Sequence, residues 1–448
     1  MQQYLVVGLG ATGQSVLEFL CRQPNTTCIG FDTRANFDLS LIRARFPKVV
    51  CHLGEVSATI LKSIKALIVS PGVPLKLPII MAAQQQGLPV FGDIELFYQH
   101  ARAPIIGITG TNAKSTVTTL VTDMINAAGN KAQMGGNIGL PALRLLDFPE
   151  PDYYVLELSS FQLELTRNLQ CLSAAVLNVS PDHLDRHGTL AEYQRAKERI
   201  YLHCKHPVYF RALPYQYPLA PHVYTFGVDA PERAQDFGVM LQHGEPYFAC
   251  GSRLLMPVAE LSPRLPGEHN VINALSALAL TAALKLELEP QLQVLRTFKG
   301  LPHRCVHIGD IRGVAWFNDS KGTNIGATAA AIKGLSKTAK GRIILILGGV
   351  GKEQDFSLLV PVLQQFVSHT LIFGRDKAKI AAAIAGESHE LADTLDAVID
   401  KAYAIAQKHD IVLFSPACAS FDMFRHYEHR GEVFTEKVNQ LRAQQQDQ

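Results

Sequence analysis

The sequence predicts an α/β fold with mostly parallel sheets, divided into three domains. Apolar segments of strand length alternate with segments of helical periodicity along almost the whole chain, and this alternation is typical of parallel sheets covered by helices. Two of the predicted strands run directly into glycine-rich turns that open helices. The 448 residues are enough for about three domains that each bury a core of their own.

The first domain is predicted at residues 1–93 and is Rossmann-like. Residues 4–7 form an apolar strand, and the glycines of GLGATG follow it in a G-x-G-x-x-G turn that leads into a helix. Asp32 ends a second strand, at the position where a dinucleotide-binding domain uses an acidic residue on a ribose. This edge of the sheet is therefore a candidate site for a phosphorylated or ribosylated ligand. Because the motif is short, a tight turn without any ligand is the alternative.

The second glycine-rich turn, GITGTNAKST at residues 107–116, is the most informative segment of the chain. It follows a strand at residues 104–108 and precedes a helix at residues 115–128, so free backbone N–H groups and the positive end of the helix dipole face an anion. Lys114 can reach terminal phosphates, and the hydroxyl groups that follow it can hold Mg²⁺. The segment therefore predicts a polyphosphate site.

The domain around this turn is predicted at residues 94–299, as a central P-loop-type ATPase domain with a mostly parallel sheet. The spacing differs from G-x-x-x-x-G-K, because Ile108 and Ala113 occupy the two glycine positions. An ordinary strand-to-helix turn with a solvated lysine is therefore the alternative. Small β elements are expected within residues 207–256, which are rich in aromatic residues, Pro and Gly.

Two further groups of polar residues follow apolar strands. Glu157 ends the strand of residues 153–156, where many nucleotide-hydrolysing folds have a second metal-binding carboxylate; a cap or a salt-bridge partner is the alternative. Residues 182–187 present two aspartates and two histidines, whose spacing does not fit a zinc site. A single histidine of this group could bind Mg²⁺ or substrate, with solvated loop histidines as the alternative.

The third domain is predicted at residues 300–448, after the linker GLPHR, as a second Rossmann-like domain. Gly300 and Pro302 interrupt the helical periodicity, between a helix that ends near Phe298 and a strand that begins near Cys305. Four more strands separated by helices are predicted within residues 314–320, 342–349, 370–374 and 410–417.

The composition fits a soluble cytoplasmic enzyme. A net charge of +2 is too small to predict a nucleic-acid surface. The hydrophobic fraction of 47% includes no uninterrupted apolar run of transmembrane length, so we expect no membrane insertion. The eight cysteines are scattered without any C-x-x-C, which is typical of reduced thiols. The chain enters its first strand directly, so no signal peptide is expected. We also expect the protein to be a monomer.

A series of motifs occurs in order across almost the whole chain: TGTNAKST, LELSSFQLE, NVSPDHLDRHG, GEHNVINALSAL, GLPHR, NDSKGTN and SPACASFD. Together they resemble the Mur ligase family, the ATP-dependent amide-forming enzymes of peptidoglycan synthesis. Within that family, the branch that adds D-glutamate is the most similar in four segments: GLGATGQS, SPGVP, LGGVGKEQDF and SPACASFDMF.

Other readings of the sequence stay open beside this resemblance. Another Mur ligase, or a ligase like the folylpolyglutamate synthases, would share the ATP motifs, although the synthases lack a Rossmann-like domain such as residues 1–93. An NAD(P)-dependent dehydrogenase would use GLGATG but would leave TGTNAKST and SPACASFD unexplained. A catalytically silent protein that binds a nucleotide sugar would not need the predicted phosphate and metal groups.

The resemblance implies a reaction in two chemical stages. ATP would phosphorylate the free carboxylate of UDP-N-acetylmuramoyl-L-alanine, and the amine of D-glutamate would attack the resulting acyl phosphate. The cofactors implied are ATP and Mg²⁺, with two metal sites. The partners implied are these small-molecule substrates, with no nucleic acid.

Four residues carry the catalytic assignments that the resemblance implies. Lys114 would bind the γ-phosphate, Glu157 would hold one Mg²⁺ together with Ser115, and His183 would help to bind the second Mg²⁺ and the substrate. Lys197 matches a lysine that is carbamylated in this family, whereas the charged helix around it predicts an exposed lysine. An ammonium ~4 Å from a divalent ion would be repelled by about 8 kcal/mol at an effective ε of about 20, so an anionic carbamate suits this position better.

The resemblance also assigns binding residues for each substrate. Those for ATP are Gly110, Thr111, Asn112, Ala113, Lys114, Ser115, Thr116, Val117, Asn270, Asn273, Arg304 and Asp319. Those for the UDP substrate are Thr12, Asp32, Thr33, Arg34, Gly72, Asn137 and His183. Those for D-glutamate are Lys321, Thr323, Lys352, Ser420, Phe421 and Tyr427. Ala113 replaces the glycine that precedes the lysine in most phosphate loops of the family, so its backbone must keep a negative φ or accept strain.

Overall fold

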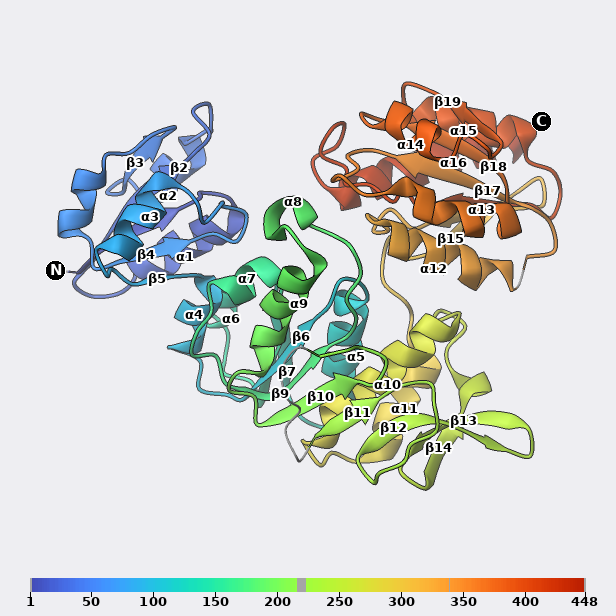
Figure 1. Cartoon of the computed structure of the whole chain (residues 1–448), viewed down its shortest axis with the longest axis horizontal. Coiled ribbons are helices and arrows are strands. Elements are labelled where there is room, and N and C mark those ends of the chain that lie inside the picture. Colours follow the sequence, from blue (N-terminus) through green and yellow to red (C-terminus); the bar gives the residue numbers. More distant parts are fainter. Residues whose placement is uncertain (1, 216–222, 338, 447–448) are drawn as a thin grey trace. The chain divides into compact units, whose positions relative to one another are not determined.

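The computed structural model of the chain describes residues 2–215, 223–337 and 339–446. Within these residues the strands form three sheets, and most strand pairs are parallel, which confirms the predicted α/β class (Figure 1). The chain divides into two compact units. The first unit comprises Met1–Val179, Ala191–Met256 and Ala274–Val294, and the second comprises Ser180–Leu190, Pro257–Asn273 and Leu295–Gln448. The domain limits at residues 93 and 299 stay a prediction.

The first sheet is parallel throughout, in the order β3–β2–β1–β4–β5. Its central strand buries Leu5, Val6 and Val7 completely, as expected for a strand that is covered on both faces. In Figure 1 the helices of this region lie around the blue sheet. The elements are β1 (Gln2–Val7), α1 (Ala11–Cys21), β2 (Thr26–Asp32), α2 (Ser40–Arg45), β3 (Val50–Leu53), β4 (Ala66–Val69), α3 (Pro78–Gln85) and β5 (Val90–Phe91).

The glycines of the first turn let α1 approach β1 closely, as the G-x-G-x-x-G pattern predicted. Gly8 has a φ of +87°, a left-handed conformation that favours glycine. A Cβ atom on Gly13 would lie 1.8 Å from the carbonyl oxygen of Gly8, so a larger residue cannot stand there. The helix therefore begins directly against the end of the strand.

The second sheet runs in the order β14–β13–β12–β11–β10–β9–β6–β8–β7. The pairs from β7 to β12 are parallel and β12 pairs antiparallel with β13. The β elements predicted within residues 207–256 therefore extend the central sheet, except that residues 216–222 of this range lie outside the described residues. The strands are β6 (Ile105–Thr109), β7 (Ala132–Gly136), β8 (Tyr153–Glu157), β9 (Cys171–Val176), β10 (His206–Phe210), β11 (Tyr224–Phe226), β12 (Asp236–Gln242), β13 (Glu245–Cys250) and β14 (Arg253–Pro257).

The helices of this part of the chain follow the carboxyl ends of several of these strands. The predicted helix after the phosphate loop is confirmed as the 14-residue α5. The helices are α4 (Asp93–Tyr98), α5 (Lys114–Ala127), α6 (Ala142–Leu145), α7 (Ser160–Glu164), α8 (Leu184–His187), α9 (Leu190–Glu198), α10 (Glu268–Ala282) and α11 (Leu288–Thr297).

The third sheet has the order β15–β16–β20–β17–β18–β19, with β15 antiparallel at one edge and the other pairs parallel. Sequence reasoning missed β19, because this edge strand has only three residues, of which His389 and Glu390 are polar and Leu391 is exposed. The elements are β15 (Val306–Ile311), β16 (Val314–Asn318), α12 (Ile325–Ser336), β17 (Ile343–Gly348), α13 (Val360–Phe366), β18 (Val367–Phe373), α14 (Lys377–Ala383), β19 (His389–Leu391), α15 (Leu395–Ile405), β20 (Ile411–Phe414) and α16 (Tyr427–Gln446).

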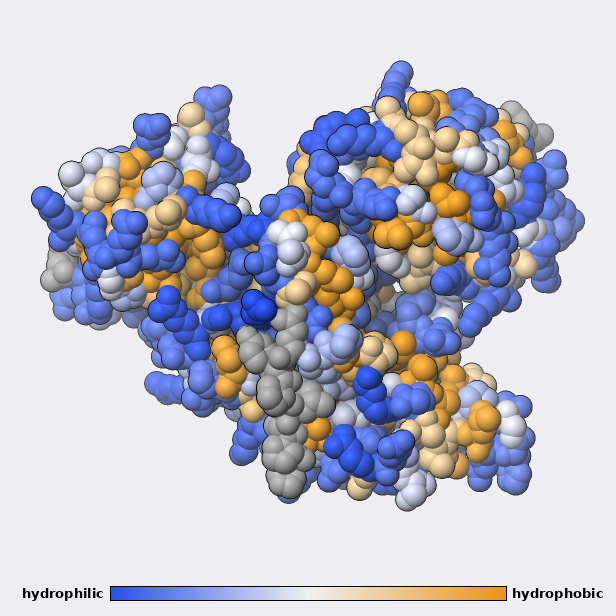
Figure 2. All heavy atoms as spheres, viewed as in Figure 1, coloured by the Kyte–Doolittle hydropathy of each residue, from blue (hydrophilic) through white to orange (hydrophobic). Residues whose placement is uncertain are grey.

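No helix in the described parts of the chain is long and apolar enough to cross a membrane. The face seen in Figure 2 mixes hydrophilic residues with scattered hydrophobic ones. The most exposed large hydrophobic side chains are those of Leu41, Leu241 and Phe421. They follow or belong to three different sheets, and isolated residues of this kind are ordinary on protein surfaces.

Candidate active site

The phosphate loop links the buried strand β6 to the N-terminus of α5, as predicted. Asn178, which follows the neighbouring strand β9, holds this loop by three hydrogen bonds. Its carbonyl oxygen accepts from the Thr111 amide at 3.0 Å, its Oδ1 accepts from the Asn112 amide at 2.8 Å, and its Nδ2 donates to the Asn112 carbonyl at 3.1 Å. Sequence reasoning missed Asn178. Its position two residues after the end of β9, a strand parallel to β6, is the signal that could have found it.

Ala113 forms the N-cap of α5 with a φ of +66° and a ψ of −6°. From the sequence, Ala113 had to keep a negative φ or accept backbone strain. The positive φ shows that it accepts the strain. A left-handed non-glycine residue costs roughly 1–2 kcal/mol, and glycine avoids most of this cost but loses about 0.5–1 kcal/mol of backbone entropy on folding.

We expect Ala113→Gly to raise the free energy of unfolding by about 0.5–1 kcal/mol, because the cost of the left-handed conformation exceeds the extra entropy loss. Denaturant titration measures this difference. Ala128→Gly, at the other end of the same helix, is the matched control: Ala128 has a φ of −81°, so glycine should destabilise there. A destabilised Ala113→Gly variant would contradict the expectation.

Two lysines converge on one carbonyl oxygen of the loop. The Nζ atom of Lys114 donates to the carbonyls of Gly110 and Thr111, both at 3.0 Å, and the Nζ atom of Lys197 donates to the Gly110 carbonyl at 2.9 Å. Lys197 is 1% exposed and lies 4.3 Å from the ring centroid of Tyr193. The expectation of an exposed lysine is therefore wrong.

The burial of Lys197 has a signal in the sequence of its helix. Tyr193, Ala196 and Ile200 are all buried and follow one another at helical spacing. Lys197 lies on the face that these residues define, four residues after Tyr193 and three before Ile200. The local excess of charged residues concealed this apolar stripe.

Glu157 ends β8, next to the strand that leads into the phosphate loop, and is 1% exposed. Its Oε1 atom accepts a hydrogen bond from Asn137 Nδ2 at 2.7 Å, and its carbonyl accepts from the Asn137 amide at 2.8 Å. Gly136 has a φ of +98°, and a Cβ atom there would lie 2.5 Å from the Glu157 carbonyl oxygen. The structure thus brings together two residues that the sequence assigned to different ligands.

This edge of the central sheet fits a metal-bound polyphosphate. The buried hydroxyls of Ser115 and Thr116 lie in the first turn of α5, and the carboxylate of Glu157 lies at the end of the adjacent strand β8. Among the described residues no cluster of three or more His, Cys, Asp and Glu side chains could hold a metal. Few protein ligands combined with phosphate oxygens are typical of Mg²⁺ rather than of a closed zinc site. Val117, also assigned to this site, is fully buried in the core.

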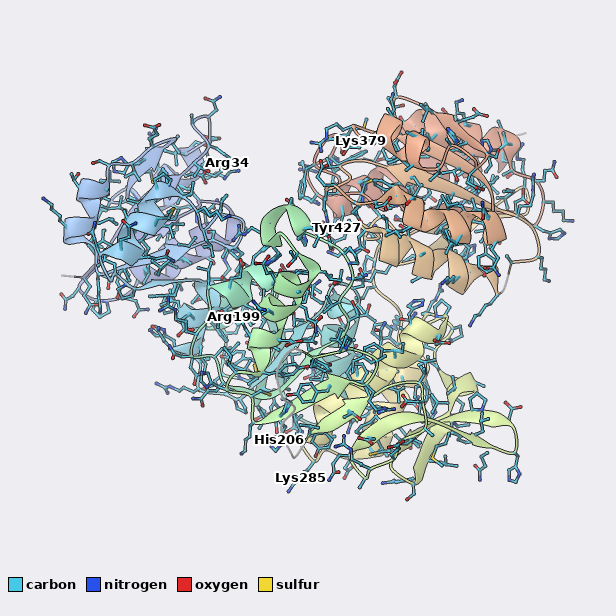
Figure 3. All side chains as sticks on the ribbon, in the orientation of Figure 1. Arg34, Arg199, His206, Lys285, Lys379 and Tyr427 are labelled. Atoms are coloured by element: carbon cyan, nitrogen blue, oxygen red, sulfur yellow. The ribbon has the colours of Figure 1, made fainter. Side chains whose placement is uncertain are left out.

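At the first sheet, Asp32 is buried at the end of β2 and bound on several sides. It accepts hydrogen bonds from the Leu9 amide at 2.8 Å and from Arg34 through the amide, Nε and Nη2 at 3.1, 2.8 and 2.9 Å. Burial alone would raise the pKa of Asp32, but the hydrogen bonds from Arg34 and Leu9 outweigh it and hold the pKa below its usual value. Arg34, labelled in Figure 3, lies on the loop after β2. Its guanidinium carbon also lies 4.2 Å from the ring centroid of Phe37.

The other residues assigned to the UDP substrate lie in loops at the same edge. Thr12 is half-buried in the first turn of α1, Thr33 is exposed after β2, and Gly72 is exposed after β4. Strands β2, β1 and β4 are parallel neighbours, so their carboxyl ends meet. The Asp32–Arg34 pair is therefore the fixed part of this surface.

In the second unit, Asp319 follows β16 and is buried. Its Oδ2 atom accepts from Ser415 Oγ at 2.6 Å and its Oδ1 atom from the Cys305 amide at 3.1 Å. Burial raises the pKa of Asp319 to about 7, although the hydrogen bond from Ser415 and the charge of Arg304 oppose the shift. Arg304 itself is half-buried.

The raised pKa of Asp319 predicts a loss of stability with rising pH. An unfolded aspartate ionises with a pKa near 3.8, whereas the pKa of the folded Asp319 is about 7. The unfolded state therefore binds fewer protons between these values, and stability falls by up to about 4 kcal/mol as pH rises through this window.

We expect Asp319→Asn to unfold at a higher temperature than the wild type at pH 8, with the difference shrinking toward pH 4. Thermal unfolding of both proteins across this range measures the effect. A difference in unfolding temperature that does not change with pH would contradict the assignment.

Asn270 and Asn273 also belong to the second unit, in the first turns of α10. Asn273 Nδ2 donates to Asn270 Oδ1 at 3.0 Å, and Asn270 Nδ2 donates to the Pro266 carbonyl at 2.8 Å. The two amides therefore orient each other on one face of the helix, as their spacing predicted.

Arg430, on α16, is fully buried, and sequence reasoning missed it. Its guanidinium donates to the Ser320 carbonyl at 2.7 Å, to Ser320 Oγ at 3.1 Å and to the Cys418 carbonyl at 3.0 Å. Burial lowers the pKa of Arg430 to about 10. The signal in the sequence is its spacing to Phe434 and Val438, which places it on the buried face of the helix.

Arg430 thereby ties together the two loops that carry most of the predicted D-glutamate residues. On one loop, Lys321 Nζ lies 3.7 Å from the ring centroid of Tyr427. Tyr427, labelled in Figure 3, begins α16. On the other, Ser420 is 2% exposed, whereas Phe421 is 75% exposed. Thr323 is half-buried near Lys321, through a hydrogen bond of 2.8 Å from its amide to the Lys321 carbonyl.

Two more residues with a predicted binding role, Lys352 and His183, belong to the second unit. Lys352 has a φ of +53° in the turn after β17, and its Nζ lies 3.2 Å from Asp182 Oδ1. His183 is half-buried with a φ of +54° at the start of α8. His183 thus lies in the second unit, while the other predicted metal ligands, Ser115, Glu157 and Lys197, lie in the first.

Three family models match the chain in succession. The model of the Mur ligase MurD-like N-terminal domain matches residues 2–92, that of the Mur ligase middle domain matches residues 108–281, and that of the Mur ligase glutamate ligase domain matches residues 303–418. The chain belongs to the Mur ligase family. This membership excludes the dehydrogenase interpretation of the first glycine-rich turn.

Named ligases from other bacteria align with nearly the whole length of this Mur ligase. It is 45% identical over 451 residues to the UDP-N-acetylmuramoylalanine–D-glutamate ligase of Methylobacillus flagellatus, covering 99% of this chain and 98% of that one. It is 43% identical to the ligase of the same name from Legionella pneumophila, covering 98% and 99%. The solved structure of UDP-N-acetylmuramate-alanine ligase from Thermotoga maritima has the same fold, with a TM-score of 0.62 at 18% identity over 98% of this chain and 100% of that one.

Proposed function

We propose that this Mur ligase adds D-glutamate to UDP-N-acetylmuramoyl-L-alanine at the expense of ATP, in the synthesis of peptidoglycan precursors. Family membership supports an ATP-dependent ligase. The observation that carries the choice of substrate is the 42–45% identity over nearly the whole chain to relatives that are named for this reaction.

The chemistry requires activation of a carboxylate, which is a poor electrophile. The terminal phosphoryl group of ATP passes to the carboxylate oxygen of the UDP substrate, and this gives an acyl phosphate and ADP. The amine of D-glutamate then attacks the acyl carbon, loses a proton and displaces phosphate, so that an amide forms. The N–H groups of the phosphate loop and Lys114 would stabilise the charge on the transferring group.

Mg²⁺ would supply charge neutralisation for the phosphate oxygens when it is bound. The carboxylate of Glu157 and the hydroxyl of Ser115 suit a hard cation, because both supply oxygen ligands. Glu157 ends β8, the neighbour of the strand that leads into the phosphate loop, and Ser115 lies in the first turn of α5. Carbamylation of Lys197 would turn a buried cation into an anionic ligand for a second Mg²⁺, together with His183. The burial of Lys197 next to the loop supports this modification.

We further propose that the enzyme acts as a monomer in the cytoplasm, where ATP and nucleotide-linked precursors are available. The proposed UDP-substrate site comprises the Asp32–Arg34 pair with Thr12, Thr33, Gly72 and Asn137. The residues proposed to bind the nucleotide are those of the phosphate loop and, in the second unit, Asn270, Asn273, Arg304 and Asp319.

Phosphate release measures the function directly. Inorganic phosphate should appear only when ATP, UDP-N-acetylmuramoyl-L-alanine and D-glutamate are all present, and D-glutamate should not be replaceable by L-alanine or L-glutamate. Release of equal phosphate with another amino acid would reassign the chain to another member of the family.

Lys352→Ala is expected to raise the KM for D-glutamate by roughly 10–100-fold, because a hydrogen-bonded charge pair with a carboxylate is lost. Ser420→Ala should raise it less, since a single hydroxyl is removed. The KM for ATP should change little in either variant. Steady-state kinetics with each substrate varied in turn test this, and a larger effect on ATP than on D-glutamate would contradict the assignment.

A further inference from the structure

The carboxylate of Asp182 is held in place from both of its oxygen atoms. The side chain is 6% exposed. Its Oδ2 atom accepts from Asn324 Nδ2 at 3.3 Å, and Asn324 is itself fixed because its Oδ1 caps α12 by accepting from the Ala327 amide at 2.9 Å. Its Oδ1 atom accepts from the His183 amide at 3.0 Å. Asp182 is thus a rigid point in the second unit.

Lys352 is bound to that rigid point. Its Nζ atom donates to Asp182 Oδ1 at 3.2 Å, and its side chain is 16% exposed. The turn that carries Lys352 is also fixed, since Gln354 donates through Nε2 to the Gly351 carbonyl at 2.9 Å and to the Ala417 carbonyl at 3.1 Å. Both ends of the Lys352–Asp182 pair therefore belong to well-defined backbone.

The energetics of a buried ion pair favour the Lys352–Asp182 contact before any substrate binds. Moving the Lys352 ammonium away from the buried carboxylate of Asp182 would cost free energy. The hydrogen bond between them is therefore favoured whether or not a substrate is present. An ammonium group has three N–H donors, of which Asp182 takes one. A free lysine side chain has among the largest rotamer entropies, and this freedom is lost before the substrate arrives.

We propose that Asp182 is a positioning residue for D-glutamate binding, which directs the Lys352 ammonium toward the substrate carboxylate. This inference rests on the proposed function, because it needs Lys352 to bind D-glutamate. The same Oδ1 atom also holds the main chain of His183, so the two assigned residues are kept in register by one carboxylate.

Kinetics of Asp182→Asn test the inference. Asparagine keeps the shape of the side chain but removes its charge, so Lys352 loses its anchor. We expect the KM for D-glutamate to rise about tenfold while the KM for ATP stays within about twofold. Asp185→Asn is the matched control, because Asp185 lies exposed in the same segment and loses the same charge. It should behave as the wild type.

A double-variant cycle separates positioning from a general structural effect. If Asp182 acts through Lys352, Asp182→Asn adds nothing to the KM for D-glutamate in a Lys352→Gln background. Asn324→Ser provides a second route, since serine can still cap α12 but cannot reach Asp182 as the amide does; it should raise the same KM about two- to threefold. Thermal unfolding of each variant shows that it is folded.

Three outcomes would overturn the role of Asp182: an unchanged KM for D-glutamate in Asp182→Asn, a lowered KM, or fully additive effects in the double variant. Failure of the proposed function has a different signature. In that case the wild type itself would release no phosphate on addition of D-glutamate, whereas loss of the Asp182 role alone leaves wild-type ligation intact.

Discussion

Replacing Lys197 by alanine is expected to reduce ligation by roughly a thousandfold, and short-chain carboxylates such as acetate should restore part of the activity. Lys197 is buried and its Nζ lies 2.9 Å from the Gly110 carbonyl, so whatever group it carries lies at the phosphate loop. Removal of a carbamylated side chain would leave a buried space without an anionic ligand, and a small carboxylate can enter such a space. Phosphate release with and without added acetate measures both effects.

The control for this experiment is Lys205→Ala, because Lys205 is exposed close to the end of the same helical segment. Its activity should equal that of the wild type, with or without acetate. The folded state of Lys197→Ala is checked by circular dichroism, since removal of a buried side chain can also destabilise the protein. Near-normal turnover without added acid would rule out a carbamate at Lys197.

Arg430→Met is expected to lower the free energy of unfolding of the second unit by about 3–5 kcal/mol and to raise the KM for D-glutamate. The guanidinium donates to the carbonyls of Ser320 and Cys418 and to Ser320 Oγ. Methionine fills a similar volume but donates no hydrogen bond, so these buried acceptors lose their partner. The loops that carry Lys321 and Ser420 then lose the connection between them.

Arg430→Lys and Arg425→Met are informative companions of this variant. Lysine keeps a charge but cannot reproduce the planar set of donors, so an intermediate stability is expected. Arg425 is exposed and precedes the same helix, so its replacement should leave both stability and KM unchanged. If Arg430→Met unfolded at the wild-type temperature with normal kinetics, the anchoring role would be wrong.

Much of this protein follows from short segments of its sequence. The alternation of apolar strands with helices determined the α/β class, and the two glycine-rich turns determined where β1 leads into α1 and β6 into α5. These features are local, because a glycine after a strand and an apolar period of 3.6 residues act within one turn or one helix. The ordered motifs likewise sufficed to assign the family, since they span nearly the whole chain.

Helix periodicity also indicates the burial of two charged residues, Lys197 and Arg430. Lys197 and Arg430 both lie on apolar faces of their helices, next to Tyr193 in one case and Phe434 in the other. Their charge led to the expectation of exposure for Lys197, and Arg430 received no assignment at all. A long charged side chain on an apolar face is ambiguous from sequence, because its stem can be buried while its head reaches solvent.

The contacts that fix the site were decided only by the tertiary structure. Asn178 clamps the phosphate loop because β9 pairs with β6, although about 66 residues separate Asn178 from Asn112. Asp182 meets Lys352 across 170 residues of sequence. Such pairs depend on how strands are ordered and how loops converge at their ends, and a polar residue in isolation gives no information on which distant donor it will meet. The sequence therefore determined the kinds of residue at the site, and packing between distant segments decided which of them are buried and joined.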